Sequence, residues 1–96
     1  MNGDEIIELL SLHWAEAAAL GVKRLAVFGS AARGELKPGS DVDVLVEFAG
    51  PATFDQYMDL KFLLEKLLAR RVDLVTRKAL KPQLRESIEK EAVYVP

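Results

Sequence analysis

Residues 28–48 read FGSAARGELKPGSDVDVLVEF and contain the pattern that decides the fold. The final part, Val42–Phe48, has the alternation of a β-strand, yet Asp41 and Asp43 stand at its start. Aspartate is a poor strand former. Because side chains alternate faces along a strand, both carboxylates point to the same side, away from the valines that follow. The start of this strand is therefore predicted to line a cleft, and its later residues to form core.

The other elements follow from apolar spacing and from residues that start or stop helices. A Thr-to-Gln capping box starts the longest helix, and a proline in its first turn starts the last one. The predicted elements are a helix over Asp4–Leu20, a strand over Lys23–Phe28, a turn or short helix over Gly29–Gly34, a strand over Val42–Phe48, a helix from Thr53 through Leu68, a strand over Val72–Thr76 and a helix from Pro82.

The connections between strands predict the topology. About a dozen residues without a full helix join the first two strands, which permits an antiparallel pair. A helix of about fifteen residues joins the second and third strands, which suits a right-handed parallel crossover. We therefore expect one α+β domain over residues 1–96, with a three-stranded mixed sheet in the order 1-2-3. Gly29, Ser30, Asp41, Asp43 and Asp73 then meet at one edge of the sheet.

The three aspartates predict a metal site. Asp73 opens the third strand, about 4.8 Å from the second, so its carboxylate can reach Asp41 and Asp43. Crowded carboxylates repel one another unless a cation compensates. Oxygen-only ligands favour Mg²⁺, with Mn²⁺ as a substitute. Two such ions about 3.5–4 Å apart suit in-line displacement at phosphorus. Glu47 lies too far along the strand and is excluded from the cluster.

Gly29 and Ser30 predict a phosphate site beside the metal site. A glycine at a strand end lets the backbone approach a ligand closely. The serine can then offer its N–H and its hydroxyl to a phosphate at the start of a helical turn. Arg33, three residues on, lies on the same face if the turn is helical and can touch the same phosphate.

Each of these residues also has a purely structural interpretation. The aspartate pair could cap the turn after Pro38, and Asp73 could form a surface ion pair with the arginines before it. Gly29 and Ser30 could be a plain turn, and Arg33 and Ser40 could order the loop. His13 lies on an apolar stripe and is interpreted as a packed histidine rather than a base.

The motif GSAARGE, followed four residues later by SDVDVLVEF, resembles the GS…DxD signature of the DNA polymerase beta nucleotidyltransferase superfamily. The RGE spacing and the VDLV after Arg71 resemble its small prokaryotic branch, the minimal nucleotidyltransferases of MNT type. The similarity covers nearly the whole chain, including the closing LKPQLRESIEKEAVYV. Gly-Ser or DxD alone is a weak signal, whereas both at this spacing, with a third aspartate, are fairly specific.

The resemblance implies a polymerase beta-like fold and a Mg²⁺-dependent nucleotidyl transfer. Gly29 and Ser30 would hold the triphosphate of an NTP, ATP in the first place. Asp41 and Asp43 would ligate two Mg²⁺ ions, and Asp73 would complete the site and help activate the attacking hydroxyl. The family implies a HEPN-domain toxin as partner, for which the MNT protein acts as antitoxin, in some systems by adenylylating it.

Two other functions stay open. The chain could be a catalytically silent antitoxin or nucleotide-binding module that masks its partner. An antibiotic-modifying transferase is the weaker reading, because such enzymes generally need a further substrate-binding domain. Few residues remain outside the core elements, so we expect the acceptor to come from a partner protein or from a homodimer with shared sites.

Composition excludes several classes. The net charge of −2 argues against a protein whose main partner is nucleic acid. No apolar run reaches the roughly 18–20 residues of a membrane span, and the first residues lack the basic region of a signal peptide. The absence of cysteine excludes disulfides and thiolate metal sites. We expect a cytoplasmic protein.

Overall fold

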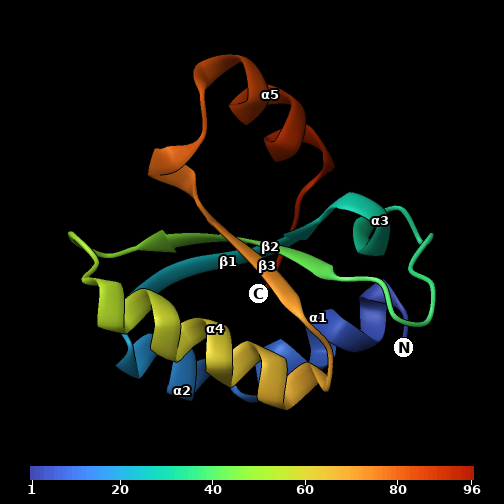
Figure 1. The fold of residues 1–96 in the computed structure, drawn as a ribbon, viewed down its shortest axis with the longest axis horizontal. Helices are drawn as coiled ribbons and strands as arrows, with labels where there is room; N and C mark the ends of the chain where they lie inside the picture. The colour runs from blue at the N-terminus through green and yellow to red at the C-terminus, as the bar shows by residue number, and fades with distance from the viewer.

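Helices and strands alternate along most of the chain (Figure 1). The structure is a computed structural model that describes residues 1–96. The helical elements are α1 (Gly3–Leu12), α2 (Trp14–Ala19), α3 (Gly29–Ala32), α4 (Phe54–Leu68), the 3₁₀ turn η1 (Arg77–Ala79) and α5 (Pro82–Glu91). The strands are β1 (Val22–Phe28), β2 (Val42–Phe48), β3 (Val72–Thr76) and β4 (Val93–Tyr94).

The strands form one mixed sheet in the order β3-β2-β1-β4. β2 is antiparallel to β1 and parallel to β3, which confirms the topology predicted from the connection lengths. The predicted sheet was incomplete by one strand, because β4 adds to the free edge of β1. Only Val93 and Tyr94 pair there, opposite Val27 and Ala26. Two residues are too few to show a strand period, so pairing at long range decides this element.

One face of the sheet carries the hydrophobic core. Figure 1 shows α1, α2 and α4 on that face and α5 on the other. The inward side chains of β2, from Val42, Val44 and Val46, are fully buried, as are Ile6 of α1 and Leu60 of α4. Alternation along β2 therefore sends Asp43 and Glu47 to the opposite face, which the helices of the core leave uncovered.

The first predicted helix is two helices. The prediction of one helix over Asp4–Leu20 was wrong, because the backbone leaves the helical region at His13, with φ −104° and ψ 19°. α1 packs against α4, whereas α2 packs against β1. The change of direction at His13 lets both helices pack against the core. The side chain of His13 lies 3.2 Å from Glu16, a surface contact at the break.

Local signals place the other helix ends as predicted. The Thr53 hydroxyl accepts the N–H of Gln56 at 3.1 Å, and the Gln56 side chain accepts the N–H of Thr53 at 2.9 Å, which forms the capping box of α4. Pro82 stands at the first turn of α5. None of the helices combines the length and apolarity needed to cross a bilayer.

Substitution of Leu60 tests the packing of α4 on the sheet. Its side chain is fully buried, so Leu60→Ala is expected to lower the free energy of unfolding by about 2–5 kcal/mol. Urea denaturation followed by circular dichroism measures the change. Phe62→Ala, on the same helix but 58% exposed, is the matched control and should change stability by no more than about 0.5 kcal/mol. Equal losses in both variants would contradict this packing.

Candidate active site

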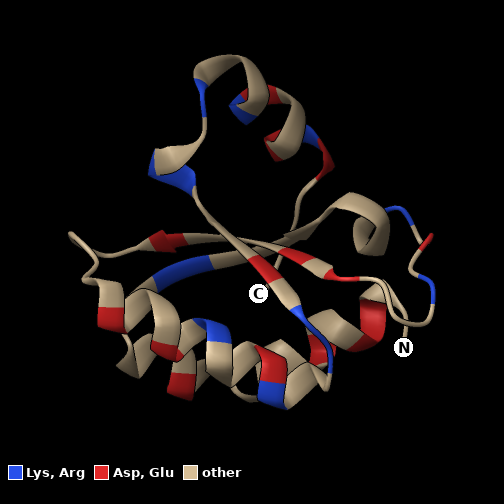
Figure 2. Cartoon of the chain, in the orientation of Figure 1, with Lys and Arg blue, Asp and Glu red and all other residues tan.

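Strand register brings the residues of the opening motif to one edge of the sheet. Phe28 at the end of β1 lies opposite Asp43 on β2, and Asp43 lies opposite Asp73 on β3. Figure 2 shows the acidic segments at the starts of β2 and β3 near each other. Gly29 follows Phe28 directly and begins α3. The sheet thus places the Gly-Ser turn, Asp43 and Asp73 side by side.

Gly29 is required where the turn meets Asp43. Its φ of +68° belongs to the left-handed region, which side chains other than glycine rarely adopt. A Cβ at this position would lie 2.1 Å from Oδ2 of Asp43, far inside van der Waals contact. The backbone of the turn can therefore approach the carboxylate only because residue 29 has no side chain.

Negative charge accumulates around Asp43. Partial burial is the largest factor that raises the pKa of Asp43, followed by the charges of Asp73, Asp41 and Glu91. The charge of Arg33 acts in the opposite direction and does not cancel them. A group so placed gains from a nearby cation, because a cation would offset both the repulsion and the lost hydration.

Asp41 is directed elsewhere in this structure. Its Oδ1 lies 3.1 Å from Nε of Arg71, an ion pair between two exposed side chains. No group of three Asp, Glu or His side chains is arranged to hold a metal ion together. The structure thus brings Asp43 and Asp73 together and leaves Asp41 beside them, paired with Arg71. The metal site formed by all three remains a prediction.

The loop before β2 is anchored by Arg70. Its Nη1 donates to the carbonyl oxygens of Lys37 at 3.1 Å and Ser40 at 3.3 Å. Ser40 contributes its backbone to this anchor, in line with a role in ordering the loop. The two adjacent arginines of the α4–β3 connection thus hold both the loop and the first aspartate of the motif.

Glu91, at the end of α5, contacts the Gly-Ser turn and was missed by sequence reasoning. Its Oε1 accepts the N–H of Gly29 at 2.5 Å, and its Oε2 accepts Nη1 of Arg33 at 3.0 Å. Nε of Arg33 also donates to Glu35 at 2.5 Å. No local pattern marks this contact, because it depends on the two-residue pairing of β4 with β1 that follows Glu91.

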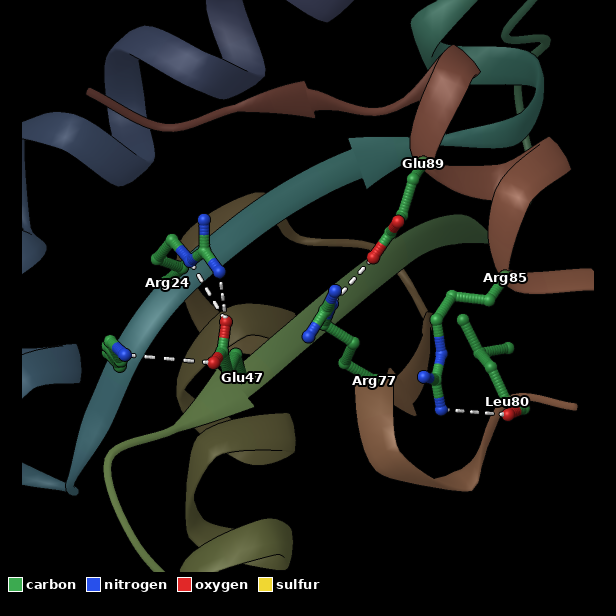
Figure 3. A network of polar contacts seen from close by, with 7 residues as sticks. Arg24, Glu47, Arg77, Leu80, Arg85 and Glu89 are labelled. Atoms are coloured by element: carbon green, nitrogen blue, oxygen red, sulfur yellow. Dashed lines mark hydrogen bonds and ion pairs between the residues drawn. The ribbon is translucent and has the colours of Figure 1, made fainter. Parts of the chain in front are cut away.

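A second polar cluster lies at the other end of the same face. Glu47 accepts two hydrogen bonds from Arg24, at 2.9 and 2.6 Å, and Arg77 donates to Glu89 of α5 at 2.5 Å (Figure 3). The hydrogen bonds from Arg24 are the main factor that lowers the pKa of Glu47. Glu47 is paired with Arg24 and does not join Asp43, which confirms its exclusion from the aspartate cluster.

Comparison with known proteins identifies the family. The nucleotidyltransferase domain family matches residues 6–95. The chain belongs to the nucleotidyltransferase family. It is 41% identical over 93 residues to the protein adenylyltransferase MntA of Thermococcus cleftensis, across 96% of this chain and 94% of that protein. The predicted resemblance to minimal nucleotidyltransferases is therefore confirmed, and the chain is a nucleotidyltransferase enzyme.

Solved structures share the α+β nucleotidyltransferase fold. One, a minimal nucleotidyltransferase, has a TM-score of 0.85 and 39% identity, with 97% of this chain and 95% of that chain covered. Another contains the tri-AMPylated HEPN toxin of Shewanella oneidensis in complex with an MNT antitoxin. It has a TM-score of 0.66 and 17% identity, with 94% of this chain and 71% of that chain covered. At that identity the likeness concerns the fold alone.

Asp43→Asn is expected to raise the melting temperature of the nucleotidyltransferase at pH 7 in chelator-treated buffer. The folded-state pKa of Asp43 is raised, so between the unfolded and folded values the folded protein binds more protons and stability falls as pH rises. At neutral pH the carboxylate is ionised, so the folded protein bears the full free-energy cost of a partly buried charge among other negative charges. The neutral amide removes that cost.

Thermal unfolding followed by circular dichroism between pH 4 and pH 7 measures the effect. The gain of Asp43→Asn over the native chain should shrink as the pH falls, because the native carboxyl becomes neutral as well. Asp59→Asn, an exposed position on α4, is the control for a changed charge alone. A gain independent of pH, or one equal in both variants, would contradict the electrostatic account.

Proposed function

We propose that this nucleotidyltransferase moves the nucleoside monophosphate of an NTP, ATP in the first place, to a hydroxyl of a partner protein. The observation that carries the proposal is the close approach of the Gly29 turn to Asp43, with Asp73 opposite on the next strand. Hydrogen-bond donors for a phosphate therefore lie next to carboxylates that can bind a cation. The name of the relative from Thermococcus cleftensis, a protein adenylyltransferase, supports this choice of reaction.

The phosphate side of the site is the turn at the start of α3. The Gly29 N–H and the Ser30 N–H and hydroxyl supply donors for the triphosphate. Arg33 supplies a charged donor on the same side, and its contact with the carboxylate that bonds Gly29 supports this placement. In this role Ser30 positions the pyrophosphate that leaves.

The carboxylate side fits a hard divalent cation. Asp41, Asp43 and Asp73 offer only oxygen ligands, and the pKa of Asp43 is raised by partial burial and then by the negative charges around it. These three residues would hold Mg²⁺, with Mn²⁺ as a substitute, once Asp41 releases Arg71. When bound, Mg²⁺ neutralises triphosphate charge and lowers the pKa of the attacking hydroxyl.

The transfer exchanges one phosphorus–oxygen bond for another. The acceptor hydroxyl oxygen bonds to the α-phosphorus, and the bond from that phosphorus to the β-phosphate oxygen breaks. Asp73 helps activate the hydroxyl by accepting its proton. The products are the nucleotidylated acceptor, pyrophosphate and a proton. Donors fixed by the sheet and the turn stabilise the charge that develops on the leaving group.

A HEPN-domain protein is the proposed acceptor. The solved complex of an AMPylated HEPN toxin with an MNT antitoxin supports this choice, since an antitoxin of the same fold is paired there with a modified toxin. In this chain, Asp41 and Asp73 are exposed, which leaves room at this edge for an acceptor presented from outside.

The alternative is that the chain neutralises its partner by masking it, whether or not it transfers a nucleotide. One observation favours it: Asp41 is paired with Arg71, and no three acidic side chains are arranged to hold a metal ion. Under this alternative, the partner would be neutralised by binding alone. The two proposals differ in whether neutralisation depends on Asp41.

Asp41→Asn separates them. With labelled ATP, Mg²⁺ and the HEPN protein from the neighbouring gene, the native chain should transfer label to that protein. The substitution should reduce transfer at least about 100-fold, because it removes a charged ligand of the Mg²⁺ that would neutralise the reacting phosphates. EDTA should abolish transfer by the native chain, and Asp59→Asn should retain it.

Neutralisation of the toxin is assayed in parallel by cell growth. Loss of both label transfer and neutralisation in Asp41→Asn supports the enzyme. Neutralisation that survives in this variant, with no label transferred by the native chain, would leave masking as the function.

A further inference from the structure

The carboxylate of Glu91 occupies the donors that the proposed function assigns to phosphate. One oxygen accepts the Gly29 N–H at 2.5 Å, and the other accepts the Arg33 guanidinium at 3.0 Å. A carboxylate resembles one edge of a phosphate, because both present two oxygens and negative charge to the same donors. A nucleotide phosphate and Glu91 therefore cannot use these two donors at once.

Glu91 is brought to the turn by the strand that follows it. β4 pairs with β1 two residues later, through Val93 opposite Val27, and the Val95 N–H donates to the carbonyl of Leu25 at 2.9 Å. Figure 1 shows the segment after α5 returning beside α3. The backbone at Glu91 is thus held by the sheet, and its side chain reaches the turn from a fixed point.

The side chain itself is free to leave. The Glu91 side chain is 31% exposed, and α5 contains no buried residue. The pair from Arg77 to Glu89 ties α5 to η1 independently of Glu91. A rotation of the glutamate side chain therefore suffices to open the site, without any movement of α5 or β4.

The charge of Glu91 also acts on the neighbouring aspartates. Its carboxylate lies close enough to Asp43 for the two charges to repel, and Asp73 and Asp41 add to the same negative field. A phosphate that arrives with a divalent cation would bring a positive charge to these aspartates, whereas Glu91 adds a negative one.

We propose that Glu91 competes with the nucleotide for the phosphate site, holding the Gly29 N–H and Arg33 until a triphosphate displaces it. Glu91 then sets the affinity for the nucleotide while making no contact with it. The inference rests on the proposed function in one respect, namely that the ligand at Gly29 is a phosphate. It assigns the last turn of α5 a role in nucleotide binding.

Removing the competitor should tighten binding. Isothermal titration calorimetry with Mg²⁺ and α,β-methylene ATP, and separately with inorganic tripolyphosphate, gives the dissociation constants. Glu91→Ala should lower both about tenfold, since a partly exposed charge-assisted contact no longer has to be broken. Glu91→Gln, which keeps the shape but not the charge, should fall between Glu91→Ala and the native chain. Glu86→Ala, on the exposed side of α5, is the matched control and should leave them unchanged.

The chemical shift of the Gly29 amide proton reports on the contact with Glu91 without an enzyme assay. In ¹⁵N–¹H spectra, this proton should shift upfield in Glu91→Ala, because the hydrogen bond to the carboxylate is lost, and tripolyphosphate should return it downfield. The Glu86→Ala spectrum should match the native one at Gly29. A Gly29 resonance unaffected by Glu91→Ala would show that the contact is absent in solution and would overturn the inference.

The outcomes separate this inference from the proposed function. Equal or weaker binding by Glu91→Ala, with the native chain still binding the ATP analogue, overturns the inference alone and makes Glu91 a support of the turn. Tighter binding without label transfer to any HEPN protein upholds the inference and counts against the transfer reaction. If no variant binds either ligand, the phosphate site itself is wrong and both proposals fail.

Discussion

The structure depends on the register of β2 between its two neighbours. Asp43 lies opposite Phe28 on β1 and opposite Asp73 on β3. This one position therefore places the Gly-Ser turn, which follows Phe28, next to the carboxylate of β3. A slip of one residue would turn Asp43 into the core and the buried valines outward. The same packing that buries Val42, Val44 and Val46 therefore keeps the candidate site together.

The site combines donors and carboxylates at close range, and the two sets act on each other. Gly29 approaches Asp43 because it lacks a side chain, and partial burial together with the repulsion among acidic groups raises the pKa of Asp43. Such an arrangement costs stability in the unliganded protein. A bound cation would supply the positive charge missing beside the aspartates, and a polyphosphate would take the place of Glu91 beside Arg33. Function and stability thus oppose each other at the same few residues.

Local sequence patterns predicted most of the fold, and long-range pairing decided the rest. Alternation from Val42 to Phe48, the capping box at Thr53 and the lengths of two connections were enough for three strands and their directions. The break at His13 depends on two helices packing against different partners. β4 depends on a two-residue ladder, and Glu91 reaches Gly29 only through it. The pairing of Asp41 with Arg71 is a choice between side-chain partners that no spacing in the sequence encodes.

We propose that the edge formed by Gly29, Asp43 and Asp73 binds a divalent cation together with a nucleotide. Line broadening by Mn²⁺ in the ¹⁵N–¹H spectrum, recorded with and without α,β-methylene ATP, tests it directly. We expect the amides of Gly29, Asp43 and Asp73 to broaden first, at lower Mn²⁺ concentrations when the nucleotide is present. Broadening centred on the exposed acidic residues of α4, or unaffected by nucleotide, would contradict it.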